Sequence, residues 1–178
     1  MTKWAREPDA AYTANDHFPV KPLRSRFVAD RQYPFTTEVS VRFAETDAQG
    51  IVHNSVYLVW FELARVEYLA RFAGGYQTLR DQGIEALVLE AHVRYLVPAR
   101  FGDTVRIHAS CGDVRGARFR YEYLVERDGE RIADGSTFHA TVDARTLRPT
   151  RLPQWLVDAV AKAESSASRE SSAPATSP

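Results

Sequence analysis

The chain has almost no cysteine and no apolar run long enough to cross a bilayer. Cys111 is the only cysteine in 178 residues, which excludes an intrachain disulfide framework and a metal site built from several cysteines. A single thiol is typical of a reducing cytosol, so we expect a cytoplasmic protein. No stretch approaches the roughly 20 apolar residues that span a membrane. The first residues contain Glu7, Asp9 and Asp16 and no apolar segment, so we expect no signal peptide.

The chain also lacks an excess of charge of either sign. It contains 23 basic and 23 acidic residues, which give a formal net charge of 0. No overall field would attract it to nucleic acid or to an anionic membrane, and we expect neither as a partner. Hydrophobic residues make up 44% of the chain, which is close to the globular average and sufficient for one buried core.

Composition divides the chain into three parts. Residues 1–34 are polar, contain four prolines and show no sustained periodicity, so we expect an irregular N-terminal arm. Residues 164–178 are rich in Ser, Ala and Pro and cannot bury much apolar surface, so we expect them to be disordered. One domain is therefore expected over residues 35–160.

The pattern of apolar residues predicts a strand, one long helix and then a series of strands. Alternation over residues 35–43 indicates a half-buried strand. Residues 54–73 repeat apolar side chains at helical spacing over most of the circumference, and Gly74 and Gly75 end this helix. The other expected elements are a short helix at 76–82, strands at 86–97, 104–113, 118–126 and 131–143, and a closing helix at 154–163.

A helix that is apolar on nearly every side must be covered on several sides. The pattern therefore predicts an α+β fold in which an antiparallel sheet curls around one long central helix. The turn and helix at residues 41–65, VRFAETDAQGIVHNSVYLVWFELAR, carry the most specific motif in the chain. Its distinctive positions are Asp47, Gly50, Val52, Asn54, Tyr57, Glu62 and Arg65.

Two further stretches accompany this motif in the same order along the chain. YLVPARFGD at residues 95–103 has a central proline and a Gly-Asp turn, and residues 135–143 contain His139. Together the three stretches resemble the hotdog-fold thioesterases of the 4-hydroxybenzoyl-CoA thioesterase type. The resemblance implies a homodimer or homotetramer with its site at a subunit interface. It also implies hydrolysis of an acyl-CoA, or of an acyl-carrier-protein thioester, to a free acid and a thiol without a metal or other cofactor.

A thioester carbonyl needs a nucleophile or base and a donor for the developing oxyanion. Asp47 lies in a turn just before the long helix, so we expect it to attack directly or to deprotonate water. A turn aspartate is the alternative interpretation. The first N–H groups of the helix have no intrahelical partner, and the resemblance implies that the one at or beside Asn54 is the oxyanion donor. His53 either orients Asp47 or the substrate, or is an ordinary residue before the helix.

Other residues have a second interpretation as well. Glu62 is either a second carboxylate at the site or the ion-pair partner of Arg65 on the same helix turn. His139 is either a site residue or a satisfied histidine of the sheet. The remaining residues expected to bind substrate are Gly50 and Val52 in the turn, Tyr57 and Phe61 beside Trp60 in an acyl pocket or in the core, and Arg115 and Arg118 for the phosphates of CoA.

Two other functions remain open within the same fold. A non-catalytic acyl-CoA-binding module would use the same pocket without hydrolysis. Hotdog hydratases and dehydratases resemble D-x-x-P-x-H, whereas here six positions separate Asp47 from His53 and no proline lies between them. Ser-His-Asp hydrolases are excluded because the chain has no G-x-S-x-G. The identity of the acyl group does not follow from the sequence.

Overall fold

The structure is a computed structural model that describes residues 33–170. The expected N-terminal arm, except for Tyr33 and Pro34, lies outside the described residues, as do residues 171–178. The strands are β1 (Phe35–Ser40), β2 (Ile84–Tyr95), β3 (Thr104–Arg115), β4 (Arg118–Arg127) and β5 (Glu130–Asp143). The helices are the 3-10 turn η1 (Phe43–Glu45), α1 (Val56–Ala73), α2 (Tyr76–Arg80) and α3 (Gln154–Glu170).

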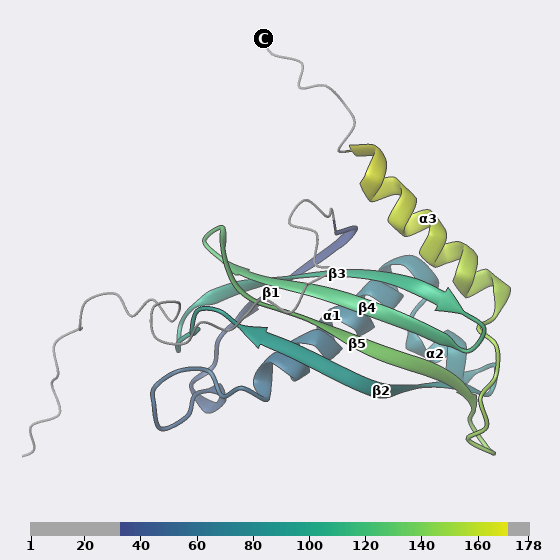
Figure 1. Ribbon diagram of the computed structural model, residues 1–178, viewed down its shortest axis with the longest axis horizontal. Coiled ribbons are helices and arrows are strands. Elements are labelled where there is room, and N and C mark those ends of the chain that lie inside the picture. The colour runs from purple at the N-terminus through teal and green to yellow at the C-terminus, as the bar shows by residue number, and fades with distance from the viewer. Residues whose placement is uncertain (1–32, 171–178) are drawn as a thin grey trace, which may run out of the picture.

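The strands form one antiparallel sheet in the order β1-β3-β4-β5-β2. Helix α1 lies along one face of this sheet, and α2 lies at the end of α1 where β2 begins (Figure 1). The α+β fold predicted from the apolar pattern and the hotdog fold implied by the resemblance are both confirmed, and the strands begin and end within a few residues of the expected positions. Strand β2 is an edge strand, and β5 is its partner within the described residues.

The core lies between α1 and the sheet and is dominated by aromatic side chains. Phe61 of α1 stacks on Tyr123 of β4 with ring centroids 4.2 Å apart. This approach requires Gly135 in β5, because a side chain there would meet the Phe61 ring and the backbone oxygen of His92. The absence of one Cβ atom therefore sets how closely the helix approaches the sheet.

The closing helix is longer than the sequence indicated. Residues 164–170 continue α3, so they are helical rather than disordered as expected, and Ala167 is buried. Glu164 accepts hydrogen bonds from the Tyr68 hydroxyl at 2.9 Å and from the backbone N–H of Cys111 at 2.7 Å. Cys111 lies in β3 beyond the part that pairs with β1, so α3 supplies the acceptor that a neighbouring strand would otherwise provide.

None of the helices within residues 33–170 is both long enough and apolar enough to span a membrane.

Candidate active site

The turn that precedes α1 fixes the direction of Asp47. The Asp47 N–H donates to the Ile51 carbonyl at 2.9 Å, and the Gly50 N–H donates to the Asp47 carbonyl at 3.0 Å. The carboxylate oxygen Oδ1 accepts from the Gln49 N–H at 2.8 Å. Gly50 has a φ of 72°, a left-handed conformation that glycine adopts without strain. The half-buried carboxylate is thus a turn aspartate whose orientation is defined by its own loop.

A buried carboxylate that the motif did not single out anchors this turn. Glu45 is 6% exposed and accepts from the backbone N–H and the guanidinium of Arg42, both at 2.8 Å. Burial alone would raise the pKa of Glu45, but the hydrogen bonds and the charge of Arg42 outweigh it and lower the pKa. The Glu45 carbonyl accepts the His53 N–H at 2.8 Å, which ties the turn to the start of α1. The spacing of Arg42 and Glu45 was the only signal in the sequence for this anchor.

The residues at the start of α1 present a free backbone donor. The His53 ring is exposed, and its Nδ1 lies 2.8 Å from the Ser55 hydroxyl, so its hydrogen bond goes to Ser55 and not to Asp47. The Asn54 carbonyl accepts from the Tyr95 hydroxyl at 2.9 Å, which joins this end of α1 to the end of β2. Within the described residues, no acceptor takes the Asn54 N–H, so this group is available to a ligand.

Several apolar residues expected in an acyl pocket or in the core are buried in the core of this chain. Tyr57 is 3% exposed and packs on Trp60, and Phe61 is 1% exposed beneath Tyr123. Val52 is also buried, at 4% exposed. None of the four expected residues, Val52, Tyr57, Trp60 and Phe61, lines the pocket that this chain forms.

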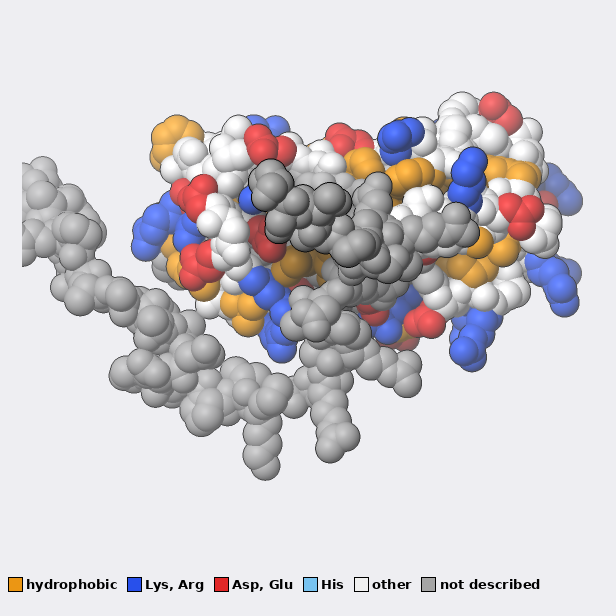
Figure 2. Space-filling view, turned by 90° about the horizontal axis from the view of Figure 1, so that it is seen from above, with side chains coloured by type: hydrophobic (Ala, Val, Ile, Leu, Met, Phe, Trp, Pro, Cys, Tyr) orange, Lys and Arg blue, Asp and Glu red, His pale blue; other side chains and the backbone are white. Residues whose placement is uncertain are grey.

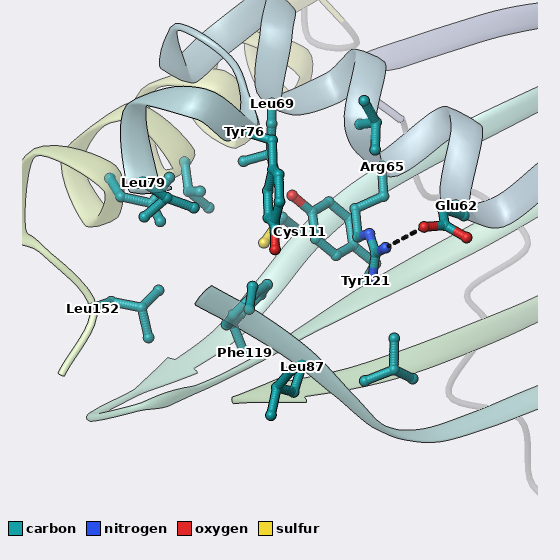
Figure 3. Close-up of a pocket in the computed structure, with 15 residues that line it drawn as sticks. Glu62, Arg65, Leu69, Tyr76, Leu79, Leu87, Cys111, Phe119, Tyr121 and Leu152 are labelled. Atoms are coloured by element: carbon teal, nitrogen blue, oxygen red, sulfur yellow. Dashed lines mark ion pairs between the residues drawn. The ribbon is translucent and has the colours of Figure 1, made fainter. Parts of the chain in front are cut away.

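That pocket has a volume of about 280 Å³ and lies towards the other end of α1, between α1, α2, α3 and the sheet (Figure 3). At 1.5 Å per residue, its wall residue Leu69 lies roughly 20 Å along the helix from Val56. Most of the wall is apolar, and the polar side chains in it include Glu62, Arg65 and Tyr121. Glu62 was predicted to be either a carboxylate of the site or the ion-pair partner of Arg65. Its side chain lines the pocket, and its Oε1 lies 3.5 Å from Nη2 of Arg65.

His139 positions the arginine of this pocket. Arg65 Nη1 lies 3.1 Å from His139 Nδ1, and His139 Nε2 lies 2.7 Å from the Thr137 hydroxyl. The same Nη1 lies 3.4 Å from His139 Nε2. Because arginine only donates, the ring nitrogen that it meets must be unprotonated, which requires a neutral imidazole. Burial, reinforced by the charge of Arg65, lowers the pKa of His139 to about 3. His139 is therefore a satisfied histidine of the sheet that holds Arg65 in place.

Exposed arginines gather at the pocket end of the molecule. Arg115 and Arg118 flank the β3–β4 turn, and neither forms an ion pair with any acidic residue in the described range. The Leu152 N–H donates to the Gly116 carbonyl at 2.9 Å, which brings the segment before α3 to the same turn. Figure 2 shows Lys and Arg side chains at this end. That segment adds three exposed arginines that were not predicted to bind substrate: Arg145, Arg148 and Arg151.

The described residues contain no group of three or more His, Cys, Asp or Glu side chains placed to hold a metal ion. The thiol of Cys111 is buried in the pocket wall.

Comparisons with known proteins agree with this geometry. The model of the thioesterase-like superfamily matches residues 41–160. Acyl-CoA thioesterase YbgC of Haemophilus influenzae is 30% identical over 121 residues, which covers 67% of this chain and 89% of that protein. A hypothetical protein of Aquifex aeolicus superposes with a TM-score of 0.68 at 31% identity, covering 71% of this chain and 99% of the other.

A thioesterase of Thermus thermophilus, solved with coenzyme A and Zn, superposes with a TM-score of 0.65 at 29% identity, covering 75% of this chain and 96% of the other. The family that the three sequence stretches resemble is thereby confirmed. The chain belongs to the thioesterase-like superfamily.

Proposed function

We propose that this protein hydrolyses an acyl-CoA thioester to a free acid and CoA, with Asp47 as its catalytic carboxylate. The reaction class, thioester hydrolysis, follows from membership of the superfamily. YbgC is named as an acyl-CoA thioesterase, and the Thermus relative was solved with coenzyme A. One observation carries the residue assignment: the turn that orients Asp47 leads directly into the free N–H of Asn54.

The Asp47 carboxylate and the Asn54 N–H would act on the carbon and the oxygen, respectively, of the same thioester carbonyl. The Asp47 carboxylate either attacks the carbonyl carbon, which gives a mixed anhydride and releases the CoA thiolate, or takes a proton from an attacking water. In the first route, water then cleaves the anhydride to the free acid. The Asn54 N–H, at the positive end of the α1 dipole, donates to the oxygen as negative charge develops. One such donor is typically worth about 10²–10³ in rate.

The surface beside this site fits a second copy of the chain. Strand β2 is an open edge of the sheet, and an open edge pairs readily with another strand. Exposed apolar side chains cover β2 and the adjacent side of α1, and surfaces of this kind mark interfaces. They are Leu87, Val88 and Leu89 on β2 and Leu58, Val59, Leu63 and Val66 on α1. We therefore infer a homodimer in which β2 pairs with β2 around a two-fold axis.

This arrangement would join the two halves of the site. Antiparallel pairing brings the Ile84 end of one β2 beside the Tyr95 end of the other. Ala86 and Leu87 near the first end line the pocket, and Tyr95 at the second end contacts Asn54. The partner's Asn54 would then lie at the pocket mouth. One chain would supply the acyl pocket and the other the catalytic turn.

The same pairing gives the arginines a role. Arg115 and Arg118 lie at the pocket end, so they would face a CoA molecule whose acyl group enters the pocket. The guanidinium groups would bind its phosphates. An acyl-carrier protein presents its acyl group on a phosphopantetheine arm and is the other substrate that this end would accept.

Release of thiol from short, medium and long-chain and aromatic acyl-CoAs tests the proposal. We expect turnover by the wild type and a loss of about 10²–10⁴ in kcat for Asp47→Asn. Glu62→Gln is the matched control, since it neutralises the neighbouring carboxylate without touching the turn. Loss of activity in Glu62→Gln alone would assign the catalytic carboxylate to Glu62. Tight binding of every acyl-CoA without turnover would favour the binding module, and hydration of an enoyl-CoA would favour the hydratase.

A further inference from the structure

The pocket contains a hydroxyl group that the protein leaves without a partner. Tyr121 is 0% exposed and lines the pocket, yet its hydroxyl has no hydrogen-bond partner within the described residues. Figure 3 shows the Tyr121 ring with its hydroxyl turned towards the side of the pocket where Tyr76 lies. Burying a polar group without a partner is costly, so such a group in a pocket wall indicates a ligand that completes it.

The surroundings of this hydroxyl define what the ligand must offer. Burial raises the pKa of Tyr121 well above its usual value, so the phenol remains protonated and able to donate. Phe119 packs beside the Tyr121 ring, and the Cys111 thiol lies in the same wall. The wall residues Leu69 and Leu79 are apolar, and the Tyr76 hydroxyl already donates to Glu85. The Tyr121 hydroxyl therefore lacks a hydrogen-bond acceptor, and a ligand that is apolar except for one oxygen atom would supply it.

Arg65 adds a second donor to the same pocket. Its side chain is 15% exposed, and it is held by a neutral His139 and by a Glu62 that is 67% exposed to water. Most of the charge of Arg65 is thus balanced only by a solvated carboxylate. A ligand oxygen in this pocket would meet a phenol donor and a guanidinium donor, whereas a purely apolar ligand would leave the phenol unpaired.

The size of the pocket limits the ligand to a medium acyl group. A cavity of 150 Å³ lined by aliphatic and aromatic side chains binds benzene. The pocket here, at about 280 Å³, has room for one ring with several further atoms or for a medium aliphatic chain. Long acyl chains exceed this volume unless they leave through the mouth.

We propose that Tyr121 determines specificity, by selecting acyl groups that carry a hydroxyl or oxo oxygen over apolar acyl groups of the same size. The inference rests on the proposed function for its substrate, an acyl-CoA, and extends it to the chemistry of the acyl group. Tyr121 would thus recognise the oxygen of the acyl group and would take no part in cleaving the thioester bond.

Two pairs of acyl-CoAs that differ by one hydroxyl test the selection. They are octanoyl-CoA with 8-hydroxyoctanoyl-CoA, and phenylacetyl-CoA with 4-hydroxyphenylacetyl-CoA. In at least one pair we expect the wild type to prefer the hydroxylated member by about tenfold in kcat/KM, the size of one neutral hydrogen bond. Tyr121→Phe removes only the hydroxyl and should reduce that ratio to about one. Tyr68→Phe is the matched control, because its hydroxyl bonds to Glu164 outside the pocket; it should keep the wild-type ratio.

Equal use of both members of both pairs, or a preference that survives in Tyr121→Phe, would overturn the inference. Binding of the four corresponding free acids, measured by isothermal titration calorimetry, separates it from the proposed function. If no thioester is hydrolysed but the hydroxylated acids bind more tightly only when Tyr121 is intact, the proposed reaction fails and the selection by Tyr121 stands. If thioesters are hydrolysed without discrimination, the reaction stands and the selection fails.

Discussion

Among single residues, His139 combines burial with contact to a permanent cation, and both keep its ring neutral. Its pKa in the folded chain is about 3, below the value of about 6.5 expected in the unfolded chain. Protonation therefore favours unfolding. The stability that the neutral ring contributes is complete above about pH 6.5 and is lost as the pH falls from there towards 3.

This titration predicts a pH-dependent stability that one substitution removes. Between about pH 6 and 4, the free energy of unfolding of the wild type should fall by about 1 kcal/mol per pH unit through His139. His139→Asn should flatten this part of the curve, although it lowers stability at pH 7 because the buried ring no longer packs on Phe119. Urea unfolding at a series of pH values checks this. Parallel curves for the two proteins would contradict a neutral, buried His139.

The proposed catalytic turn could be selected from the sequence, whereas the pocket could not. Asp47, Asn54 and the Glu62–Arg65 pair lie in one continuous motif, and the resemblance of that motif to a known family, more than its spacing, singled them out. Tyr121 and Leu152 reach the pocket from separate segments that only the folded sheet brings together. The sequence left open whether Tyr57 and Phe61 face the core or a pocket, because α1 is apolar on nearly every side and its periodicity does not distinguish the two faces.

At the scale of elements, α3 shows how little apolar surface is needed to dock a helix. Its last part has the Ser- and Ala-rich composition of a disordered tail, yet it is helical as far as Glu170. Buried small side chains such as Ala167 allow it to lie close to its neighbours, and Glu164 satisfies a backbone N–H of β3 that β1 does not reach. The composition did not reveal this because both contacts, the burial of Ala167 and the hydrogen bonds of Glu164, depend on where the fold places α3.

The approach of α1 to the sheet predicts an unusual sensitivity to one methyl group. Gly135→Ala would place a Cβ atom against the ring of Phe61 and the backbone of His92, and neither can move without disturbing the core. We expect a loss of about 3 kcal/mol in the free energy of unfolding.

Gly129→Ala is the comparison for this prediction. Gly129 has a φ of 80° with open space around it, so alanine there costs only left-handed strain of about 1 kcal/mol. Denaturant unfolding of both variants measures the difference. Equal, small losses would mean that the helix and sheet are not in close contact at Gly135.

For the whole molecule, the open edge of β2 and the separation of the catalytic turn from the pocket point to the same arrangement. The fold itself followed from the alternation of strand residues and the all-round apolar helix. The sequence pattern did not predict which strand lies at the edge of the sheet. Strand order depends on long-range pairing, such as that of β2 with β5. A site shared between two chains is the property of the molecule that most needs a direct test.

Complementation between two inactive variants provides that test. Asp47→Asn removes the carboxylate proposed to be catalytic, and Ala86→Phe fills the pocket from the sheet side. Each variant alone should be inactive towards a medium-chain acyl-CoA that the wild type hydrolyses. In a co-expressed mixture, each mixed dimer would have one site with an intact pocket and the partner's Asp47, so about a quarter of wild-type activity should return. A mixture no more active than its separate components would contradict a site completed across the dimer.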